Sequence, residues 1–223
     1  MNKSERMLNA CEVLALVGAA PVSHAVVERI LAVSDLVVGV DGGADTLAQI
    51  DHTPEIVLGD LDSLSHDARL RFGDRLLLIT EQDTTDFEKA LLHVAAPLTL
   101  AVGFLGGRLD HTLAALNVVA RHPARRIILI GDDDVSFLAG TRLTLRGLSD
   151  GTRISLTPLA PCRVSSGDLR WPLADAQFAP DGQISPSNQI AADPARISCD
   201  GPLLVTVPLE ALPAVMTAVA RER

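Results

Sequence analysis

Apolar runs alternate with helical spacing along the first 130 residues. Short apolar runs predict buried strands, and apolar residues three and four positions apart predict amphipathic helices. The predicted strands are Val13–Val17, Leu36–Val40, Glu55–Leu58, Leu76–Ile79, Thr99–Phe104 and Arg126–Ile130. The predicted helices are Val22–Ala32, Ala44–Ile50, Ser65–Phe72, Phe87–Ala95 and His111–Arg121. This alternation predicts a mainly parallel sheet with helices on both faces.

The pattern changes after about Leu138. Helical spacing stops, and short alternating or apolar segments follow with Gly, Pro, Ser and Asp between them, which is typical of an all-β domain. These segments include Thr141–Leu145, Arg153–Thr157 and Leu203–Val207. The last stretch, Leu209–Arg221, has helical spacing, and Pro213 is tolerated in its first turn. We therefore predict an α/β domain over residues 1–139 and a smaller all-β domain over residues 140–223.

Six aspartates lie just past the ends of predicted strands. In parallel sheets, ligands bind beyond the carboxyl ends of the strands, so these acids are expected at one edge. Asp60 and Asp62 lie two residues apart in Gly59–Ser63, where an extended backbone would point both side chains the same way. Only a cation would offset their repulsion, and Mg²⁺ prefers carboxylate oxygen. The sequence predicts a site for one or two magnesium ions at this edge, where only some of the six acids bind metal directly. The six acids are Asp41, Asp60, Asp62, Asp83, Asp86 and Asp110.

Turns and helix caps are the alternative interpretation of the same acids. Gly, Asp and Ser in Gly59–Ser63 are all turn formers. Thr85 or Asp86 would suit the N-cap of the helix that starts at Phe87, and Asp110 would suit the cap of the next helix. Independent turns account poorly for six acids at one edge of a sheet.

Glycine pairs follow two of the strands, at Gly42-Gly43 and Gly106-Gly107. They would let backbone amides approach a phosphate at a helix N-terminus, or they are simply tight turns. Arg108 would either contact a phosphate or pair with a nearby acid. The two lysines, Lys3 and Lys89, do not follow a GxxxxG loop, and no GxGxxG motif follows a strand. A nucleotide would therefore be held by metal and acids.

Composition narrows the class of protein. Apolar residues make up 48% and charged residues 21%, which predicts a folded chain with a core. The net charge of −9 argues against nucleic acid as a partner. The three cysteines, Cys11, Cys162 and Cys199, form no disulfide or zinc framework, as expected in a reducing cytosol. No apolar run reaches transmembrane length and no signal peptide is evident, so we expect a soluble cytoplasmic protein without a membrane partner.

Four motifs of the first domain, in this order and spacing, resemble those of the thiamine pyrophosphokinase family, and two later ones resemble its thiamine-side motifs. The first four are Asp41–Asp45, Gly59–Ser63, Asp83–Asp86 and Gly106–His111. The later two are Gly167–Leu173 and Ser185–Asn188. The hexapeptide GGRLDH together with the pentapeptide GDLDS is highly specific for this family.

The resemblance implies a Rossmann-like three-layer α/β/α catalytic domain followed by a β-sandwich domain, in a homodimer with the active site between subunits. It implies Mg²⁺-dependent transfer of pyrophosphate from ATP to thiamine, with release of AMP. Carried over by position, the magnesium and phosphate ligands are Asp60, Asp62, Asp83, Asp86 and Asp110, with Asp41, Gly42, Gly43, Gly106, Gly107 and Arg108 near the nucleotide. Trp171, Ser187 and Asn188 would contact thiamine, and the catalytic candidates are Asp60, Asp62, Asp86 and Asp110.

Some positions depart from the family pattern or keep a second interpretation. Gly18–Pro21 stands where many members carry an Asn-Gly turn, and Gln189 where they often carry Glu. Without the resemblance, a lone Trp171 would be a core residue and Ser185–Gln189 a loop. Two other functions use the same acids: a metal-dependent nucleotide phosphohydrolase, and a non-catalytic thiamine or nucleotide sensor. The number of metal ions stays open, as does the choice of Asp86 or Asp110 as the base.

Overall fold

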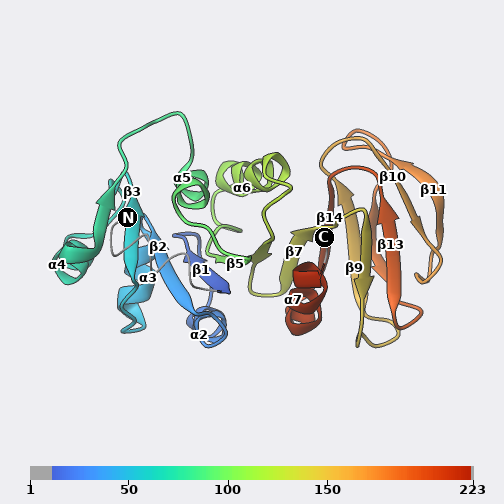
Figure 1. The fold of residues 1–223 in the computed structure, drawn as a ribbon, viewed down its shortest axis with the longest axis horizontal. Coiled ribbons are helices and arrows are strands. Elements are labelled where there is room, and N and C mark those ends of the chain that lie inside the picture. Colours follow the sequence, from blue (N-terminus) through green and yellow to red (C-terminus); the bar gives the residue numbers. More distant parts are fainter. Residues whose placement is uncertain (1–11, 222–223) are drawn as a thin grey trace. The chain divides into compact units, whose positions relative to one another are not determined.

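A computed structural model describes residues 12–221 (Figure 1). These residues form two compact units. One unit runs to Val118 and includes Leu129–Asp132, and the other comprises Val119–Ile128 and the chain from Asp133 onward. The domain boundary predicted at Ala139–Gly140, between an α/β domain and an all-β domain, stays a prediction.

A parallel sheet forms the centre of the first unit. Its strands are β1 (Val13–Val17), β2 (Leu36–Val40), β3 (Ile56–Gly59), β4 (Leu76–Leu78) and β5 (Leu98–Val102), in the order β5-β1-β2-β3-β4. β1 pairs in parallel with both β2 and β5. The order reverses at β1, because the later strands β2 to β4 extend to one side and β5 to the other. Such a reversal opens a crevice beyond the carboxyl ends of the neighbouring strands β1 and β5.

Helices lie on both faces of this sheet and bury its central strands. The helices are α2 (His24–Leu31), α3 (Gly43–Gln49), α4 (His66–Phe72), α5 (Asp86–His93) and α6 (Leu109–Arg121). In Figure 1, α5 and α6 lie on one side of the strands and α2 and α3 on the other. Every residue of β2 and β5 is buried, as expected for strands between two helical layers. The predicted α/β/α architecture is confirmed.

Of the two predicted N-caps of α5, Thr85 is confirmed and Asp86 is wrong, and the predicted cap of α6 at Asp110 is also wrong. The side chain of Thr85 caps α5 by accepting a hydrogen bond from Glu88 N at 3.3 Å, so Asp86 is the first helical residue and not the N-cap. α6 begins at Leu109, so Asp110 lies inside the helix and not at the predicted cap. Both aspartates are therefore available for other contacts, and their charge suits a helix N-terminus.

The second unit is a sandwich of antiparallel strands. One set is ordered β12-β9-β14-β7 and the other β11-β10-β13-β8. The strands are β7 (Asp134–Leu138), β8 (Arg142–Leu145), β9 (Arg153–Pro158), β10 (Cys162–Ser166), β11 (Leu173–Phe178), β12 (Ser185–Gln189), β13 (Ala195–Cys199) and β14 (Leu203–Pro208). Buried and more exposed residues alternate along β9 and β13, as expected for strands with one face on a core.

Two further elements complete the chain. β6 (Ile127–Ile130) is buried throughout, and α7 (Leu212–Arg221) follows β14 after a short 3₁₀ turn, Leu209–Ala211. The expectation of a loop at Ser185–Gln189 is wrong, because this polar segment pairs with β9 as β12. No helix within residues 12–221 has the length and apolar character that crossing a bilayer requires.

Candidate active site

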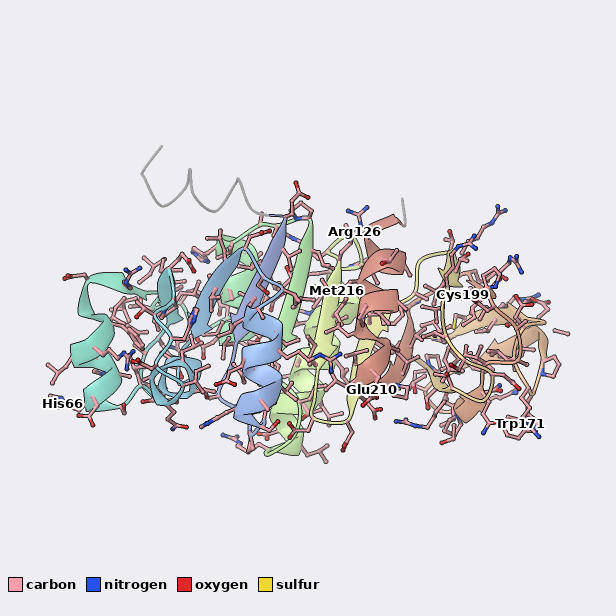
Figure 2. The ribbon with its side chains drawn as sticks, turned by 90° about the horizontal axis from the view of Figure 1, so that it is seen from below. His66, Arg126, Trp171, Cys199, Glu210 and Met216 are labelled. Atoms are coloured by element: carbon pink, nitrogen blue, oxygen red, sulfur yellow. The ribbon has the colours of Figure 1, made fainter. Side chains whose placement is uncertain are left out.

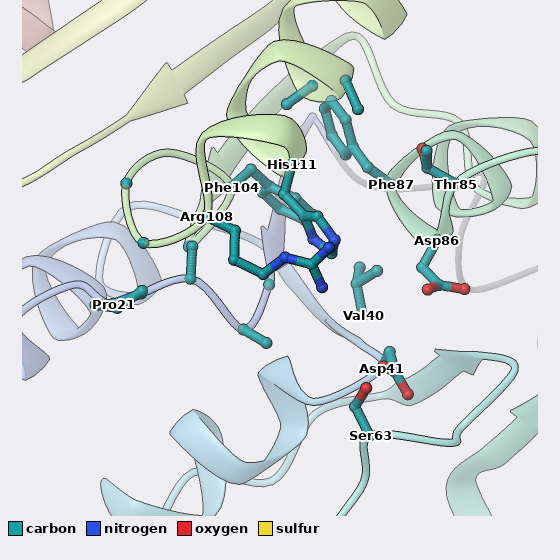
Figure 3. Close-up of a pocket in the computed structure, with 18 of the residues that line it drawn as sticks. Pro21, Val40, Asp41, Ser63, Thr85, Asp86, Phe87, Phe104, Arg108 and His111 are labelled. Carbon is teal, nitrogen blue, oxygen red and sulfur yellow. The ribbon is translucent and has the colours of Figure 1, made fainter.

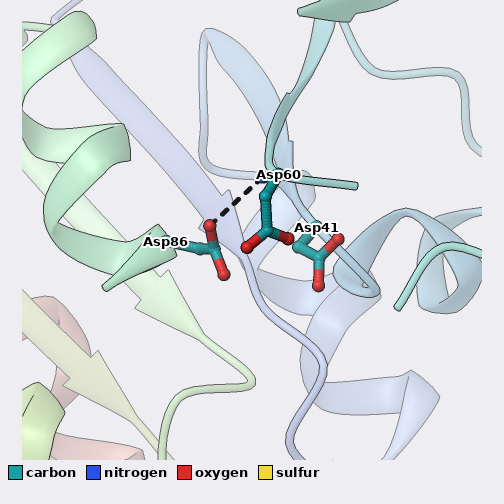
Figure 4. Close-up of side chains that lie close together, drawn as sticks. All are labelled: Asp41, Asp60 and Asp86. Atoms are coloured by element: carbon teal, nitrogen blue, oxygen red, sulfur yellow. Dashed lines mark hydrogen bonds between the residues drawn. The ribbon is translucent and has the colours of Figure 1, made fainter. Parts of the chain in front are cut away.

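Three aspartates of the first unit converge beyond the carboxyl ends of β2 and β3 (Figure 4). Asp41 follows β2, Asp60 follows β3, and Asp86 opens α5. One carboxylate oxygen of each lies within 4.8 Å of the others. We call these three residues the aspartate cluster. Hard oxygen donors at this spacing suit Mg²⁺.

One carboxylate oxygen of Asp41 is buried without a hydrogen bond from any described residue. The residue is 8% exposed, and its Oδ1 is buried without a hydrogen-bond partner in the described part of the chain. Burial raises the pKa of Asp41 more than hydrogen bonds from Gly42 and Ser63 lower it, and the charges of Asp86 and Asp60 add to the rise. A buried carboxylate oxygen without a donor costs free energy that a bound cation would offset. The residues present therefore fit a divalent metal.

The predicted pairing of Asp60 with Asp62 on one face is wrong. The intervening Leu61 has a φ of 61°, so the backbone turns instead of staying extended. Asp60 Oδ1 accepts a hydrogen bond from Asp62 N at 3.2 Å, which forms the turn that composition also suggested. Leu61 itself is buried against Ala44 and Phe72. Asp62 is exposed and lies outside the cluster, although it lines the same cavity.

Lys89 is a charged residue of this site that sequence reasoning missed. Its side chain is 2% exposed, and its Nζ lies 3.0 Å from Asp86 Oδ1 and 3.8 Å from Asp60 Oδ2. Burial lowers the pKa of Lys89, but the hydrogen bond to Asp86 and the charges of Asp86, Asp60 and Glu81 outweigh burial and raise it. Its spacing of three residues from Asp86 on a helix was the available signal.

The pKa of Asp60 is lowered, whereas the pKa values of Asp41 and Lys89 are raised. Burial would raise the pKa of Asp60, but the hydrogen bond from the Asp62 backbone and the charge of Lys89 hold it below its usual value. Lys89 therefore favours the ionised form of this carboxylate.

A cavity of about 740 Å³ lies at the strand-order reversal (Figure 3). The loop after β1, Gly18–Pro21, and the loop after β5, Gly103–Arg108, line it, together with the aspartate cluster, Asp62 and Ser63. Phe87 and Phe104 form its apolar side, with ring centroids 4.4 Å apart. Gly18–Pro21, which had no predicted role, is thus part of the wall. The cavity has the mixed apolar and charged lining of a small-molecule site.

The glycine pairs occupy different surroundings. Gly106 and Gly107 line the cavity with φ values of 84° and 62°, which favour glycine. Gly43 lies against the backbone of Val17 and Gly18, where a Cβ would overlap the Val17 carbonyl. Gly43 therefore has a packing reason to be glycine, and its predicted phosphate contact stays a prediction.

Arg108, Asp110 and Asp83 lie apart from the cluster. Arg108 lines the cavity but is paired with Asp110, whose Oδ2 lies 2.6 Å from the guanidinium. This hydrogen-bonded pair lowers the pKa of Asp110. Asp83 is exposed in the loop before α5, where its N–H donates to Glu81 Oε2 at 2.9 Å. The structure thus gathers three of the six predicted acids, places Asp62 at the cavity, and leaves Asp83 and Asp110 outside it.

The predicted thiamine residues belong to the second unit. The expectation that a lone Trp171 would be core is wrong, because this side chain is 56% exposed at the surface (Figure 2). Asn188 is buried, and Ser187 has a φ of 53° and donates its N–H to Ser155 Oγ at 3.0 Å. Arg170 N donates to Gln189 O at 2.8 Å, so the backbone of Gln189 anchors the Trp171 loop.

Sequence comparisons cover both halves of the chain. Residues 27–130 match the family model described as the catalytic domain of thiamin pyrophosphokinase, and residues 141–204 match its vitamin B1 binding domain. Thiamine pyrophosphokinase 1 of Arabidopsis thaliana is 28% identical over 178 residues, which covers 71% of this chain and 67% of the relative. Thiamine pyrophosphokinase 2 of rice, Oryza sativa subsp. japonica, is 29% identical, with 72% and 67% covered.

Solved structures share the fold. Thiamin pyrophosphokinase from Candida albicans has a TM-score of 0.76 at 17% identity, with 91% of this chain and 90% of the other covered. The enzyme from Geobacillus thermodenitrificans has a TM-score of 0.74 at 24% identity, with 88% and 96% covered. The matched domains and named relatives confirm the predicted transferase activity of a thiamine pyrophosphokinase. The chain belongs to the thiamin pyrophosphokinase family.

Proposed function

We propose that the cavity of the first unit binds ATP with Mg²⁺ at the aspartate cluster, and that the pyrophosphoryl group passes from this site to thiamine. The observation that carries the proposal is Asp41 Oδ1, a buried carboxylate oxygen without a donor, beside Asp60 and Asp86. The cavity lies at the strand-order reversal, where parallel sheets hold their ligands. Asp62 borders this cavity and is a further candidate ligand.

Bound Mg²⁺ would offset negative charge on the phosphate oxygens as AMP leaves. Arg108, at the cavity wall, would add charge-assisted hydrogen bonds to the same phosphates. The glycines Gly106 and Gly107 leave room for phosphate beside the first turn of α6. Positioning of the acceptor oxygen supplies much of the remaining rate. Asp86 and Asp110 are the two candidate bases for its proton, and Asp83 stays a candidate phosphate-side ligand.

Thiamine recognition falls to the exposed Trp171. An exposed indole face stacks well on a cationic heteroaromatic ring. The buried Asn188 amide holds the Trp171 backbone, so we assign it the task of positioning this ring; Ser187 is exposed beside it. In this proposal, residues 1–139 bind ATP and Mg²⁺, and residues 140–223 bind thiamine.

A homodimer with the active site between subunits is part of the proposal. Support comes from α6, where Leu109 and Leu113 lie one helical turn apart and are 71% and 56% exposed. An apolar stripe of this kind suits a second copy of the chain. Leu113→Lys should then shift the molar mass measured by light scattering toward the monomer. A cytoplasmic location is also proposed, since the three scattered cysteines of the sequence show no disulfide framework.

The experiment that tests the proposal measures AMP release from ATP with Mg²⁺, with and without thiamine. We expect release only with thiamine, and its loss in Asp60→Asn. Asp51→Asn is the matched control, because Asp51 is an exposed acid of the same unit that pairs with Arg71. Release of AMP without thiamine would favour the phosphohydrolase, and thiamine binding without turnover would favour the sensor.

A further inference from the structure

Lys89 is buried beside two carboxylates of the aspartate cluster. It is 1% exposed and is the only lysine within residues 12–221. Its Nζ donates a hydrogen bond to Asp86 Oδ1 at 3.0 Å. Asp60 N donates to the same oxygen at 3.4 Å, the hydrogen bond drawn in Figure 4. Two donors from different segments thus hold one oxygen of Asp86, and none of the residues 12–221 donates a hydrogen bond to its Oδ2.

The charges also match a divalent cation. With Asp41, Asp60 and Asp86 all ionised, one ammonium leaves the group with two net negative charges. Three carboxylates this close repel one another strongly without a cation between them. Lys89 limits that repulsion in the metal-free protein and still leaves a charge that one divalent ion would neutralise.

Stability alone explains a buried lysine poorly. Removing an ammonium from water costs several kcal/mol, and a buried ion pair often stabilises a fold no better than well-packed apolar residues do. Position 89 lies on α5 among buried residues that include Phe87 and Ala90. The ion pairs of the Lys89 side chain are with Asp86 and Asp60, both members of the cluster.

We propose that Lys89 is a positioning residue of the metal site, which fixes the Asp86 carboxylate and holds Asp60 and Asp86 together before the metal arrives. This inference rests on the proposed magnesium site. Residues that hydrogen-bond to metal ligands commonly change metal affinity by about 10–100-fold when they are removed.

The test uses the full chain without nucleotide and measures Mn²⁺ binding by electron paramagnetic resonance. We expect Lys89→Met to weaken Mn²⁺ binding by about 10–100-fold, and Lys89→Arg to restore part of the affinity. In the AMP assay, the Mg²⁺ concentration for half-maximal rate should rise more than kcat falls. Arg71→Met is the matched control, because it removes a cation from an ion pair on α4 of the same unit.

The outcomes separate this inference from the function on which it rests. If the wild-type chain binds no Mn²⁺, the metal site itself is refuted. If the wild type binds Mn²⁺ and Lys89→Met binds it equally or more tightly, the positioning role alone is refuted. Circular dichroism spectra establish that the variants are folded, and if Lys89→Met fails to fold, Lys89→Gln, which keeps a donor without the charge, decides by the same criterion.

Discussion

The side-chain amide of Asn188 hydrogen-bonds to both the N–H and the carbonyl of Trp171. Asn188 Oδ1 accepts a hydrogen bond from Trp171 N at 3.2 Å, and Asn188 Nδ2 donates to Trp171 O at 2.9 Å. The same amide also contacts Gln189 N at 2.8 Å and Ser185 Oγ at 3.2 Å. A buried side chain with four hydrogen bonds to three residues thus fixes the residue that carries an exposed indole.

Asn188→Ala should therefore weaken thiamine binding without touching the ATP cavity. Leaving the Trp171 backbone groups without partners costs about 1–3 kcal/mol, so we expect thiamine affinity to fall by roughly tenfold. Trp171 is the only tryptophan in the chain, so quenching of its fluorescence by thiamine reports this site alone. Gln177→Ala, an exposed amide on β11, should leave the titration unchanged. Equal affinity in Asn188→Ala would contradict the positioning role.

Gly43→Ala should destabilise the first unit. The added Cβ would lie 1.9 Å from the carbonyl oxygen of Val17, at the end of the buried strand β1. Overpacking of this kind costs roughly 1–3 kcal/mol, and each 1 kcal/mol lowers Tm by about 2–4 °C in a chain of this size. Gly73→Ala is the control, because nothing lies within 4 Å of its Cβ position. Calorimetry that gives both variants the wild-type Tm would refute the packing role.

Asp41→Asn should stabilise the metal-free protein at neutral pH. The raised pKa means that the folded form holds this proton to higher pH than the unfolded chain does, so the free energy of unfolding falls as pH rises through that interval. Above that interval the wild type carries the full cost, and its removal should raise Tm by about 2–4 °C for each 1 kcal/mol gained. The gain should shrink below about pH 4, where the carboxyl group is protonated in both states.

The same variant should respond less to divalent ions. Mg²⁺ that binds the folded form alone raises its stability, so the wild type should gain more than Asp41→Asn when Mg²⁺ is added. A metal-free variant at pH 7 that melts below the wild type would contradict this account of Asp41.

Asp110→Asn should separate turnover from metal binding. Asp110 holds the guanidinium of Arg108 beside the cavity but lies outside the aspartate cluster. We expect Mn²⁺ affinity without nucleotide to stay at the wild-type value, while thiamine-dependent AMP release slows by about tenfold or more. Asp175→Asn disrupts a comparably exposed pair with Arg163 in the second unit and should slow nothing. Loss of Mn²⁺ binding in Asp110→Asn would place this residue among the ligands instead.

Local patterns predicted most of the first unit. The strands β1 and β2 match their predicted bounds because each is an unbroken apolar run, and α5 was found from its cap at Thr85. The motifs identified Asp60 and Asp86, which the structure brings together. These features depend on neighbours in the sequence, which explains why they could be predicted.

Tertiary contacts decided the rest. The burial of Leu61 in the core between α3 and α4 turns the backbone after Asp60, and no local pattern announces a leucine with positive φ. Lys89 is buried because Asp86 on its own helix and Asp60 from a distant segment both face its ammonium, and only the first of these contacts is local in the sequence. β12 is polar and forms a strand only because β9 pairs with it. The expectation that a lone tryptophan is buried was wrong for Trp171, because the exposure of its side chain depends on the loop that Asn188 holds by hydrogen bonds.

The position of manganese in crystals grown with Mn²⁺ and a non-hydrolysable ATP analogue tests the central claim most directly. Anomalous scattering should place the ion in coordination distance of Asp60 and Asp86, with the triphosphate beside it in the cavity of the first unit. An ordered nucleotide whose metal is bound elsewhere, with Asp41, Asp60 and Asp86 all free of it, would contradict the account.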